Sequence, residues 1–300
     1  MNARTGLRVQ RLQIQLQARD DVDLGRNPGS TLRGALAAGL FARWCHGGPS
    51  SAPCHWRHCP ACFLLLAADP HRHRGQAVPR PYALEPGPAR VEAGALWSFS
   101  LTLIGPAIEL GEAVVDAIAW AAGRGFGRGR GRSTLLASRR IPPISGAAVG
   151  VLDDDAVSAS CAPAARLTVT FRTPLRLVHR GALVKRPDLV VLTHRLLERL
   201  EALSACYSVA PPLASVWRER RAEIAAVARA AQLVEERTRW VEAWSGSRRT
   251  GTRTPTGGIV GAAVWQGELT PLVPWLRWGE AVHVGKNAVK GDGWMVVQTA

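Results

Sequence analysis

The sequence has no apolar run long enough to cross a membrane, because no stretch reaches the roughly 18 uninterrupted apolar residues that a spanning helix needs. Residues 1–17 alternate polar and apolar types and lack the continuous apolar region of a signal peptide. Both a membrane protein and a secreted protein are therefore unexpected. We expect a cytoplasmic protein.

Tyrosine and lysine are also scarce, with two and three residues in a chain of 300. Of the 38 basic residues 35 are arginine, and the 23 acidic residues leave a formal net charge of +15. The planar guanidinium group binds phosphate in a bidentate manner and stacks on bases, so this excess favours a nucleic-acid partner. A GC-rich coding sequence is an alternative source of part of the arginine.

The pattern of apolar residues predicts an α+β protein with two domains. The 47% apolar content suffices for a core in each and excludes disorder of the whole chain. The second half repeats the strand-then-helix order of the first, although no sequence repeat is detectable. We predict domains at residues 1–145 and 164–300, with residues 142–163 as the linker. The expected strands are 7–17, 96–104, 133–139, 166–171, 258–266 and 294–298, and the expected helices are 30–45, 108–122 and 189–207.

A glycine-rich segment at residues 283–293 precedes the last predicted strand. Gly285, Gly291 and Gly293 can adopt positive φ without steric cost, so their loop could turn its backbone N–H groups toward a phosphate. Lys286 and Lys290 lie in the same segment. A tight turn with no ligand is the alternative, and the spacing alone leaves both readings open.

A second glycine-rich run, residues 123–132, places arginines beside Phe126. Flexible backbone, basic side chains and an aromatic ring together favour RNA binding through phosphate contacts and base stacking. The alternative is a disordered linker, but the position directly after a predicted helix favours an ordered loop. The predicted RNA-binding arginines are Arg124, Arg128, Arg130 and Arg132.

Four of the six cysteines fall within eighteen residues: Cys45, Cys54, Cys59 and Cys62. In a reducing compartment such a cluster favours a structural zinc ion over disulfides. The spacing contains a single C-x₂-C pair, so a set of thiols without metal stays an alternative. A nearby histidine could replace one cysteine as ligand. The surrounding residues 45–90 show no periodicity and are interpreted as a Cys/His-rich insertion in the first domain.

Two histidines are candidates for proton transfer. His46 follows the first predicted helix, and His283 stands two residues before Gly285. A histidine titrates near neutral pH, so it can act as the acid or base when a 2′-hydroxyl attacks its neighbouring phosphate. For His46 the alternative is a zinc ligand or a solvent-facing helix end. For His283 it is a residue that holds the loop in shape.

The order of these motifs resembles the CRISPR-associated repeat-processing endoribonucleases of the repeat-associated mysterious protein (RAMP) superfamily, over nearly the whole chain. The resemblance is carried by residues 32–36 (LRGAL), the Cys59-Pro60-x-Cys62 pair, and residues 125–132 (GFGRGRGR), 173–176 (TPLR), 257–261 (GGIVG) and 283–286 (HVGK).

The resemblance implies tandem ferredoxin-like (RRM-like) domains whose glycine-rich loop contacts RNA. It further implies metal-independent cleavage of the CRISPR repeat RNA to a 2′,3′-cyclic phosphate and a 5′-hydroxyl, with no catalytic cofactor. The family's catalytic histidine corresponds to His46. A guanidinium near it in the sequence, Arg33 or Arg43, would stabilise the phosphorane. Lys290 stands where the family often has an aromatic residue, and no tyrosine or lysine lies near His46 in the sequence.

Two other functions stay open at this stage. One is a non-catalytic RNA-binding RAMP subunit that works with other subunits of a CRISPR effector complex. The other is a zinc-containing DNA-binding protein, which the cysteines and the net charge would also fit.

Overall fold

Two antiparallel four-strand arrangements with the same strand order organise the computed structural model, which describes residues 4–47, 59–66, 78–246 and 253–300. In the first, the strands lie in the order β3-β5-β1-β6, with the short β7 (Val151–Leu152) also paired to β1. Its elements are β1 (Val9–Ala18), α1 (Pro28–Trp44), β3 (Tyr82–Glu85), β5 (Leu96–Ile104), α2 (Gly111–Arg124) and β6 (Ser133–Ile141).

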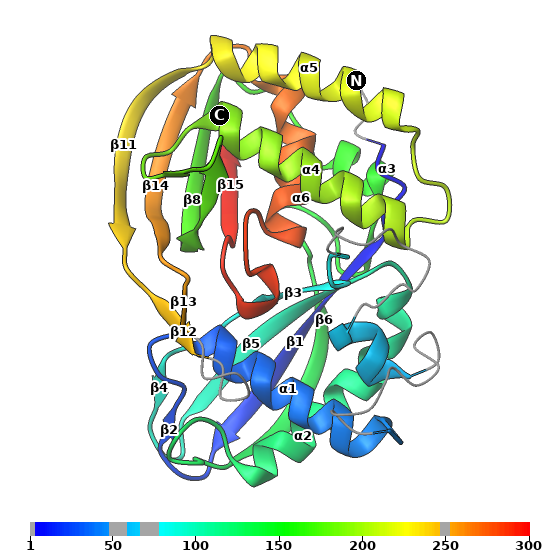
Figure 1. Ribbon diagram of the computed structural model, residues 1–300, viewed down its shortest axis with the longest axis vertical. Helices are drawn as coiled ribbons and strands as arrows, with labels where there is room; N and C mark the ends of the chain where they lie inside the picture. Colours follow the sequence, from blue (N-terminus) through cyan, green and yellow to red (C-terminus); the bar gives the residue numbers. More distant parts are fainter. Residues whose placement is uncertain (1–3, 48–58, 67–77, 247–252) are drawn as a thin grey trace.

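The second sheet has the order β11-β14-β8-β15. In both sheets the strands of the domain lie in the order second, third, first, fourth along the chain. Both are the β-α-β-β-α-β arrangement of a ferredoxin-like fold, so the predicted duplication is confirmed. The first domain forms the lower half of the molecule and the second the upper half (Figure 1). The elements are β8 (Arg166–Leu175), α4 (Leu189–Tyr207), α5 (Ala214–Ala230), β11 (Gln232–Val241), β14 (Gly258–Gln266), α6 (Val273–Val282) and β15 (Met295–Thr299).

Several shorter elements differ from the sequence expectation. The predicted linker contains β7 and α3 (Asp154–Ala159), and the polar segment after β8 forms the hairpin β9 (Leu177–His179) and β10 (Ala182–Val184). The insertion ends earlier than predicted, because β3 already belongs to the first sheet. The remaining elements are β2 (Val22–Asp23), η1 (Cys62–Leu66), β4 (Arg90–Val91), η2 (Gly105–Leu110), β12 (Trp244–Gly246), β13 (Arg253–Pro255), η3 (Thr270–Leu272) and η4 (Ala288–Lys290).

Helix α1 illustrates how the sequence produces the first layer. Leu32, Leu36 and Leu40 recur every fourth residue and are all buried, so one face of the helix joins the core. The predicted start of this helix at residue 30 is two residues late. The helix begins at Pro28, and the Asn27 side chain accepts a hydrogen bond from the Ser30 N–H at 3.3 Å. Proline is favoured at the first helical position because its missing N–H would have no helical partner.

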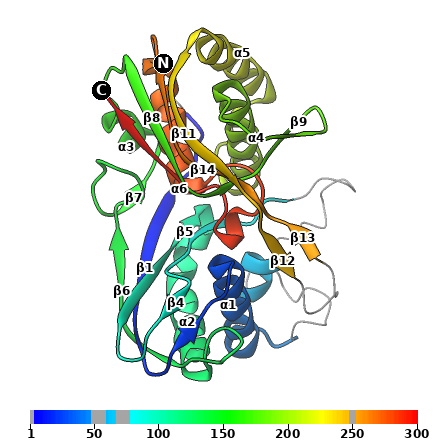
Figure 2. The same cartoon turned by 90° about the vertical axis from the view of Figure 1, so that its left-hand side faces the viewer.

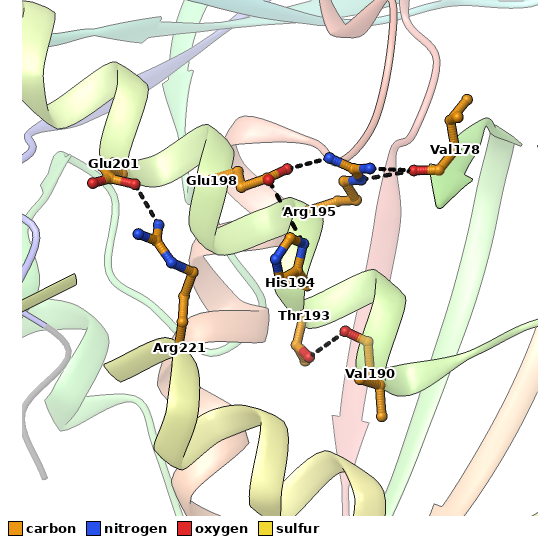
Figure 3. A network of polar contacts seen from close by, with 8 residues as sticks. All are labelled: Val178, Val190, Thr193, His194, Arg195, Glu198, Glu201 and Arg221. Atoms are coloured by element: carbon orange, nitrogen blue, oxygen red, sulfur yellow. Dashed lines mark hydrogen bonds and ion pairs between the residues drawn. The ribbon is translucent and has the colours of Figure 1, made fainter. Parts of the chain in front are cut away.

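Polar contacts on α4 tie the helices and a hairpin of the second domain together (Figure 3). The Arg195 guanidinium donates through Nε to the Val178 carbonyl at 2.8 Å and pairs with Glu198 at 2.5 Å. Arg221 of α5 pairs with Glu201 of α4. Partly exposed pairs of this kind contribute little stability each, so their role is to orient β9 and α5.

The two domains share a seam that is lined by backbone and polar contacts. The Thr5 N–H donates to the Asp154 carboxylate at 2.8 Å, and Ser204 Oγ donates to the Thr5 carbonyl at 2.5 Å. The loop between α6 and β15 descends from the second domain to α1 and β3 of the first (Figure 1). In the described ranges no helix is both long and apolar enough to cross a membrane.

Within the seam, Gly29 of α1 contacts the backbone of Lys290. A Cβ added at Gly29 would lie 1.9 Å from the Lys290 carbonyl oxygen, whereas a Cβ at Gly34 meets no described atom within 4 Å. We therefore expect Gly29→Ala to lower the free energy of unfolding by about 1–3 kcal/mol through overpacking. The control Gly34→Ala should raise it by about 0.5–1 kcal/mol, because alanine favours helix.

Urea denaturation of the two variants measures this difference. If Gly29→Ala is as stable as Gly34→Ala, the seam does not depend on this contact.

Candidate functional site

The glycine-rich segment forms a tight turn that packs on the first domain. Gly285, Gly291 and Gly293 have φ of 82°, 89° and 73°, and Asn287 is also left-handed at 69°. A Cβ at Gly293 would lie 1.8 Å from the Val284 carbonyl oxygen, so glycine is required there. The turn before β15 is thus real, and its use as a phosphate cradle stays a prediction.

Three cations from three separate segments approach one another where this loop meets α1 and β3. Burial lowers the pKa of Lys290, and the positive charges of Arg33 and Arg80 lower it further. The pKa of Arg80 is also lowered, first by burial and then by Arg33. The sequence predicted roles for Arg33 and Lys290 but missed Arg80, because it follows an insertion without periodicity.

Both tyrosines of the chain lie at the same place. Tyr82 of β3 is fully buried, and although Arg33 and Arg80 act to lower its pKa, burial raises it. Tyr207 at the end of α4 donates its hydroxyl hydrogen to the Pro79 carbonyl at 2.6 Å. Arg80 Nε in turn donates to the Leu65 carbonyl at 2.5 Å. These two hydrogen bonds hold the side chains of Tyr207 and Arg80 in place. The sequence contains one indirect indication of this cluster, which is that tyrosine is rare in the chain and both tyrosines lie here.

His283 is enclosed in the seam instead of facing a ligand. It is 0% exposed, and burial lowers its pKa to about 3, helped by the charges of Arg199 and Arg11. The ring is therefore neutral near physiological pH. Its backbone caps α6 at a φ of 61°, with its N–H bonded to the Gly279 carbonyl at 3.0 Å. These facts favour the alternative that His283 shapes the loop.

The neighbouring Asp292 is also unusual, with 4% of its surface exposed. Burial raises the pKa of its carboxyl group to about 7, against the opposing effects of Asn287, Lys290 and Arg176. Its N–H donates to the Asn287 carbonyl at 3.3 Å, so Asp292 closes the glycine-rich turn.

His46 is exposed and lies beyond the C-terminal end of α1. Arg33 and Trp44 are eleven residues apart in this helix, which at 1.5 Å per residue is about 16 Å along its axis. His46 is thus too distant to share one phosphate with Arg33 in this arrangement. The nearer Arg43 is paired with Asp116 at 3.1 Å.

Three of the predicted metal ligands converge beside His46. The Sγ atoms of Cys45, Cys59 and Cys62 all lie within 4.8 Å of one another, and the Cys45 and Cys62 sulfurs are 4.0 Å apart. A tetrahedral site with Zn–S bonds of about 2.3 Å separates its sulfurs by about 3.8 Å, so the arrangement fits zinc. Cys54, the fourth predicted ligand, lies outside the described residues.

The arginine-rich run forms an ordered turn between α2 and β6, as the sequence favoured. Phe126 is buried and packs edge-on against Trp97 at a centroid distance of 5.3 Å. Arg132 pairs with Asp20 at 2.8 Å, and Arg124 lies over the Trp120 ring at 4.6 Å. The turn lies at the lower end of the first domain, away from the glycine-rich loop (Figure 1), so the structure does not join the two predicted RNA-binding segments.

Comparison with known proteins gives two family matches that divide the chain. A family model described as an N-terminal domain matches residues 7–160, and the model of the CRISPR-associated endoribonuclease Cas6 matches residues 169–295. No curated protein matches the chain in sequence.

Solved structures resemble the chain over nearly its whole length. A Cas6 product complex has a TM-score of 0.62 at 17% identity, covering 97% of this chain and 99% of that one. Thermus thermophilus Cas6 has a TM-score of 0.59 at 15% identity with the same coverage. A chain of a partial Cas6-RT-Cas1–Cas2 complex has a TM-score of 0.60 at 13% identity, covering 98% of this chain and 46% of that one.

At such identities the structural likeness shows a shared fold, and it agrees with the tandem ferredoxin-like topology. The Cas6 family match covers the second domain, including the glycine-rich loop. The chain therefore belongs to the family of the N-terminal domain whose model matches residues 7–160, and its second domain is similar to the CRISPR-associated endoribonuclease Cas6.

Proposed function

We propose that this protein is an endoribonuclease that cuts CRISPR repeat RNA without a metal ion. The observation that carries the proposal is the seam where Arg33, Arg80 and Lys290 gather beside buried Tyr82. Like charges repel, so a cluster drawn from three segments is suited to a bound anion. An RNA phosphate has that charge and accepts several hydrogen bonds from guanidinium groups.

The proposed reaction is attack of an RNA 2′-oxygen on the adjacent phosphorus atom. A P–O bond to the 2′-oxygen forms, the bond to the 5′-oxygen breaks, and a proton moves from the 2′-hydroxyl to the leaving oxygen. The products are a 2′,3′-cyclic phosphate and a 5′-hydroxyl. We propose His46 as the principal acid or base of this proton transfer.

Arg33 and Lys290 bind the RNA backbone at the seam in this proposal. Because His46 lies well beyond hydrogen-bond range of Arg33, the two residues act on different phosphates of one RNA that follows α1. Arg80 also binds the RNA backbone at the seam. The loop that holds the RNA strand is shaped by Gly285, Lys286, Gly291 and Gly293. His283 keeps the structural role that its burial favours.

The separation of His46 from the basic cluster also gives weight to the second candidate, an RNA-binding subunit without catalysis. We also propose that the protein is cytoplasmic and associates with other CRISPR proteins. Cleavage by the purified wild-type protein separates the two candidates.

Single-turnover cleavage of repeat RNA in EDTA tests the proposal. We expect His46→Ala to lower the cleavage rate constant by about 10²- to 10⁴-fold, as loss of an acid or base does, with little change in RNA affinity. Arg33→Gln should mainly weaken RNA binding. His179→Ala is the control, because this histidine lies on the β9–β10 hairpin of the second domain.

A substrate with a 2′-deoxy sugar at the cut should not be cleaved. Cleavage of that substrate, or a strict Mg²⁺ requirement, would contradict the mechanism. Full activity of His46→Ala would remove His46 from it.

We also propose that Cys45, Cys59 and Cys62 hold a structural zinc ion. The Cys59 thiol lies 3.4 Å from the Trp44 carbonyl at the end of α1, so the cluster fastens the helix end that carries His46. A zinc ion held there would fix α1 to η1, since Cys62 is the first residue of η1.

Metal analysis of protein that has never met a chelator should give about one zinc equivalent, and Cys62→Ser should lose most of it. Cys161→Ser is the matched control, because Cys161 is partly buried in the other half of the chain. Less than about half an equivalent in the wild type would contradict a zinc site.

A further inference from the structure

A short buried helix connects the proposed metal site to the cationic cluster of the seam. Cys62 is the first residue of η1, and the Leu65 carbonyl near the other end of η1 accepts the hydrogen bond from Arg80 Nε at 2.5 Å. Both Cys62 and Leu65 are buried, with 2% and 3% of their surfaces exposed. A movement of η1 at its cysteine would therefore also move the acceptor that Arg80 uses.

Helix η1 also contacts the second domain close to Arg80. The Phe63 ring packs edge-on against the Tyr207 ring at a centroid distance of 6.0 Å, and the Tyr207 hydroxyl donates to the Pro79 carbonyl at 2.6 Å. Tyr207 is the last residue of α4, and Figure 2 shows α4 on the same side of the molecule as α1, whose C-cap is Cys45. Arg80 is thus held by η1 through its own side chain and by α4 through the residue before it.

These contacts matter because the charges around Arg80 repel it. The positive charge of Arg33 lowers the pKa of Arg80, and the charge of Arg80 in turn lowers the pKa of Lys290. A guanidinium group among like charges lowers its free energy by turning toward water. The Leu65 carbonyl offers Arg80 an acceptor without a negative charge that would compete with an anion. The position of η1 therefore determines whether Arg80 stays available to an anion at the seam.

The three cysteines of the cluster determine how firmly η1 is held. As thiols, Cys45 and Cys62 make a weak contact with their sulfurs 4.0 Å apart, whereas as thiolates all three would bond one zinc ion at about 2.3 Å. Zinc would thereby fasten η1 to the end of α1. The Phe63 N–H donates to the Cys59 carbonyl at 2.9 Å, so Cys59 and η1 would move as one unit.

We propose that zinc binding at these three cysteines and RNA binding at the seam are coupled through η1 and Arg80, so that each raises the affinity for the other. The inference rests on the proposed function for the RNA and on the proposed zinc site. Linkage makes the effect reciprocal, so zinc raises the affinity for RNA by the same factor as RNA raises the affinity for zinc. Zinc then acts on RNA binding and not on the chemical step, which is compatible with cleavage that needs no metal ion.

Zinc affinity measured with and without RNA tests the inference. A chromophoric chelator competes with the protein for zinc, and the RNA is a repeat RNA with a 2′-deoxy sugar at the cut, at one concentration that saturates every variant. We expect RNA to lower the zinc dissociation constant of the wild type by about fivefold or more, as coupled sites do. Arg80→Met keeps the length of the side chain without its donors, so this effect of RNA should disappear.

Arg33→Met is the matched control, because it removes a charge from the same cluster and leaves the hydrogen bond between Arg80 and the Leu65 carbonyl in place. Its RNA affinity should fall, while the effect of saturating RNA on zinc affinity persists. Zinc that binds to the RNA itself is the same in every sample and cancels between variants. If Arg80→Met fails to fold, Tyr207→Phe should reduce the effect instead, because it removes the hydrogen bond to the Pro79 carbonyl.

The outcomes separate this inference from the proposed function. A shift that Arg33→Met retains and Arg80→Met loses supports the coupling, even if the wild type fails to cut unmodified RNA, which would contradict only the nuclease proposal. No shift in the wild type, or the same behaviour in both variants, overturns the coupling, and cleavage in EDTA would leave the nuclease proposal standing. A wild type that binds no zinc overturns the coupling together with the zinc site.

Discussion

The contact between Gly29 and the Lys290 backbone is the constraint on which the rest of the structure depends. It allows η4 to pack closely against α1, and no residue larger than glycine fits at position 29. The same packing places Lys290 near Arg33, and His283 and Asp292 are buried in the seam. The close contact between the α1 and η4 backbones therefore determines where the charged side chains lie. The packing of the two ferredoxin-like domains brings these two segments together.

The electrostatics of the seam follow from that approach. Burial and like charge both lower the pKa of Lys290, and burial raises the pKa of Asp292 to about 7. A low-dielectric, cationic environment is expensive without an anion and favourable with one. This is why the seam is better suited to a phosphate than to a neutral ligand.

Much of the fold could be predicted from the sequence. The alternation of Leu12, Ile14 and Leu16 predicted β1, and the glycines at 285, 291 and 293 predicted a turn with positive φ. These signals are local, because they depend on period and on backbone freedom. The repeated topology was also accessible, since each half shows its strands and helices in the same order.

The site was harder to predict from the sequence, because its residues are brought together only by tertiary packing. Arg80 and Tyr82 follow a segment without periodicity, and nothing local ties them to Arg33 or Lys290. The expectation that Arg33 accompanies His46 overlooked the length of α1, which separates them. The converging sulfurs of Cys45, Cys59 and Cys62 show the opposite case, where proximity in sequence did indicate proximity in space.

Photocrosslinking tests most directly whether the seam is where the RNA backbone lies. A repeat RNA with 4-thiouridine a few nucleotides from its cut, where the strand is proposed to cross the seam, can be crosslinked to the protein, and the modified peptides can be mapped by mass spectrometry. The account predicts crosslinks in α1, in residues 80–85 and in residues 283–293. Crosslinks confined to the turn at residues 123–132 or to α5 would contradict it.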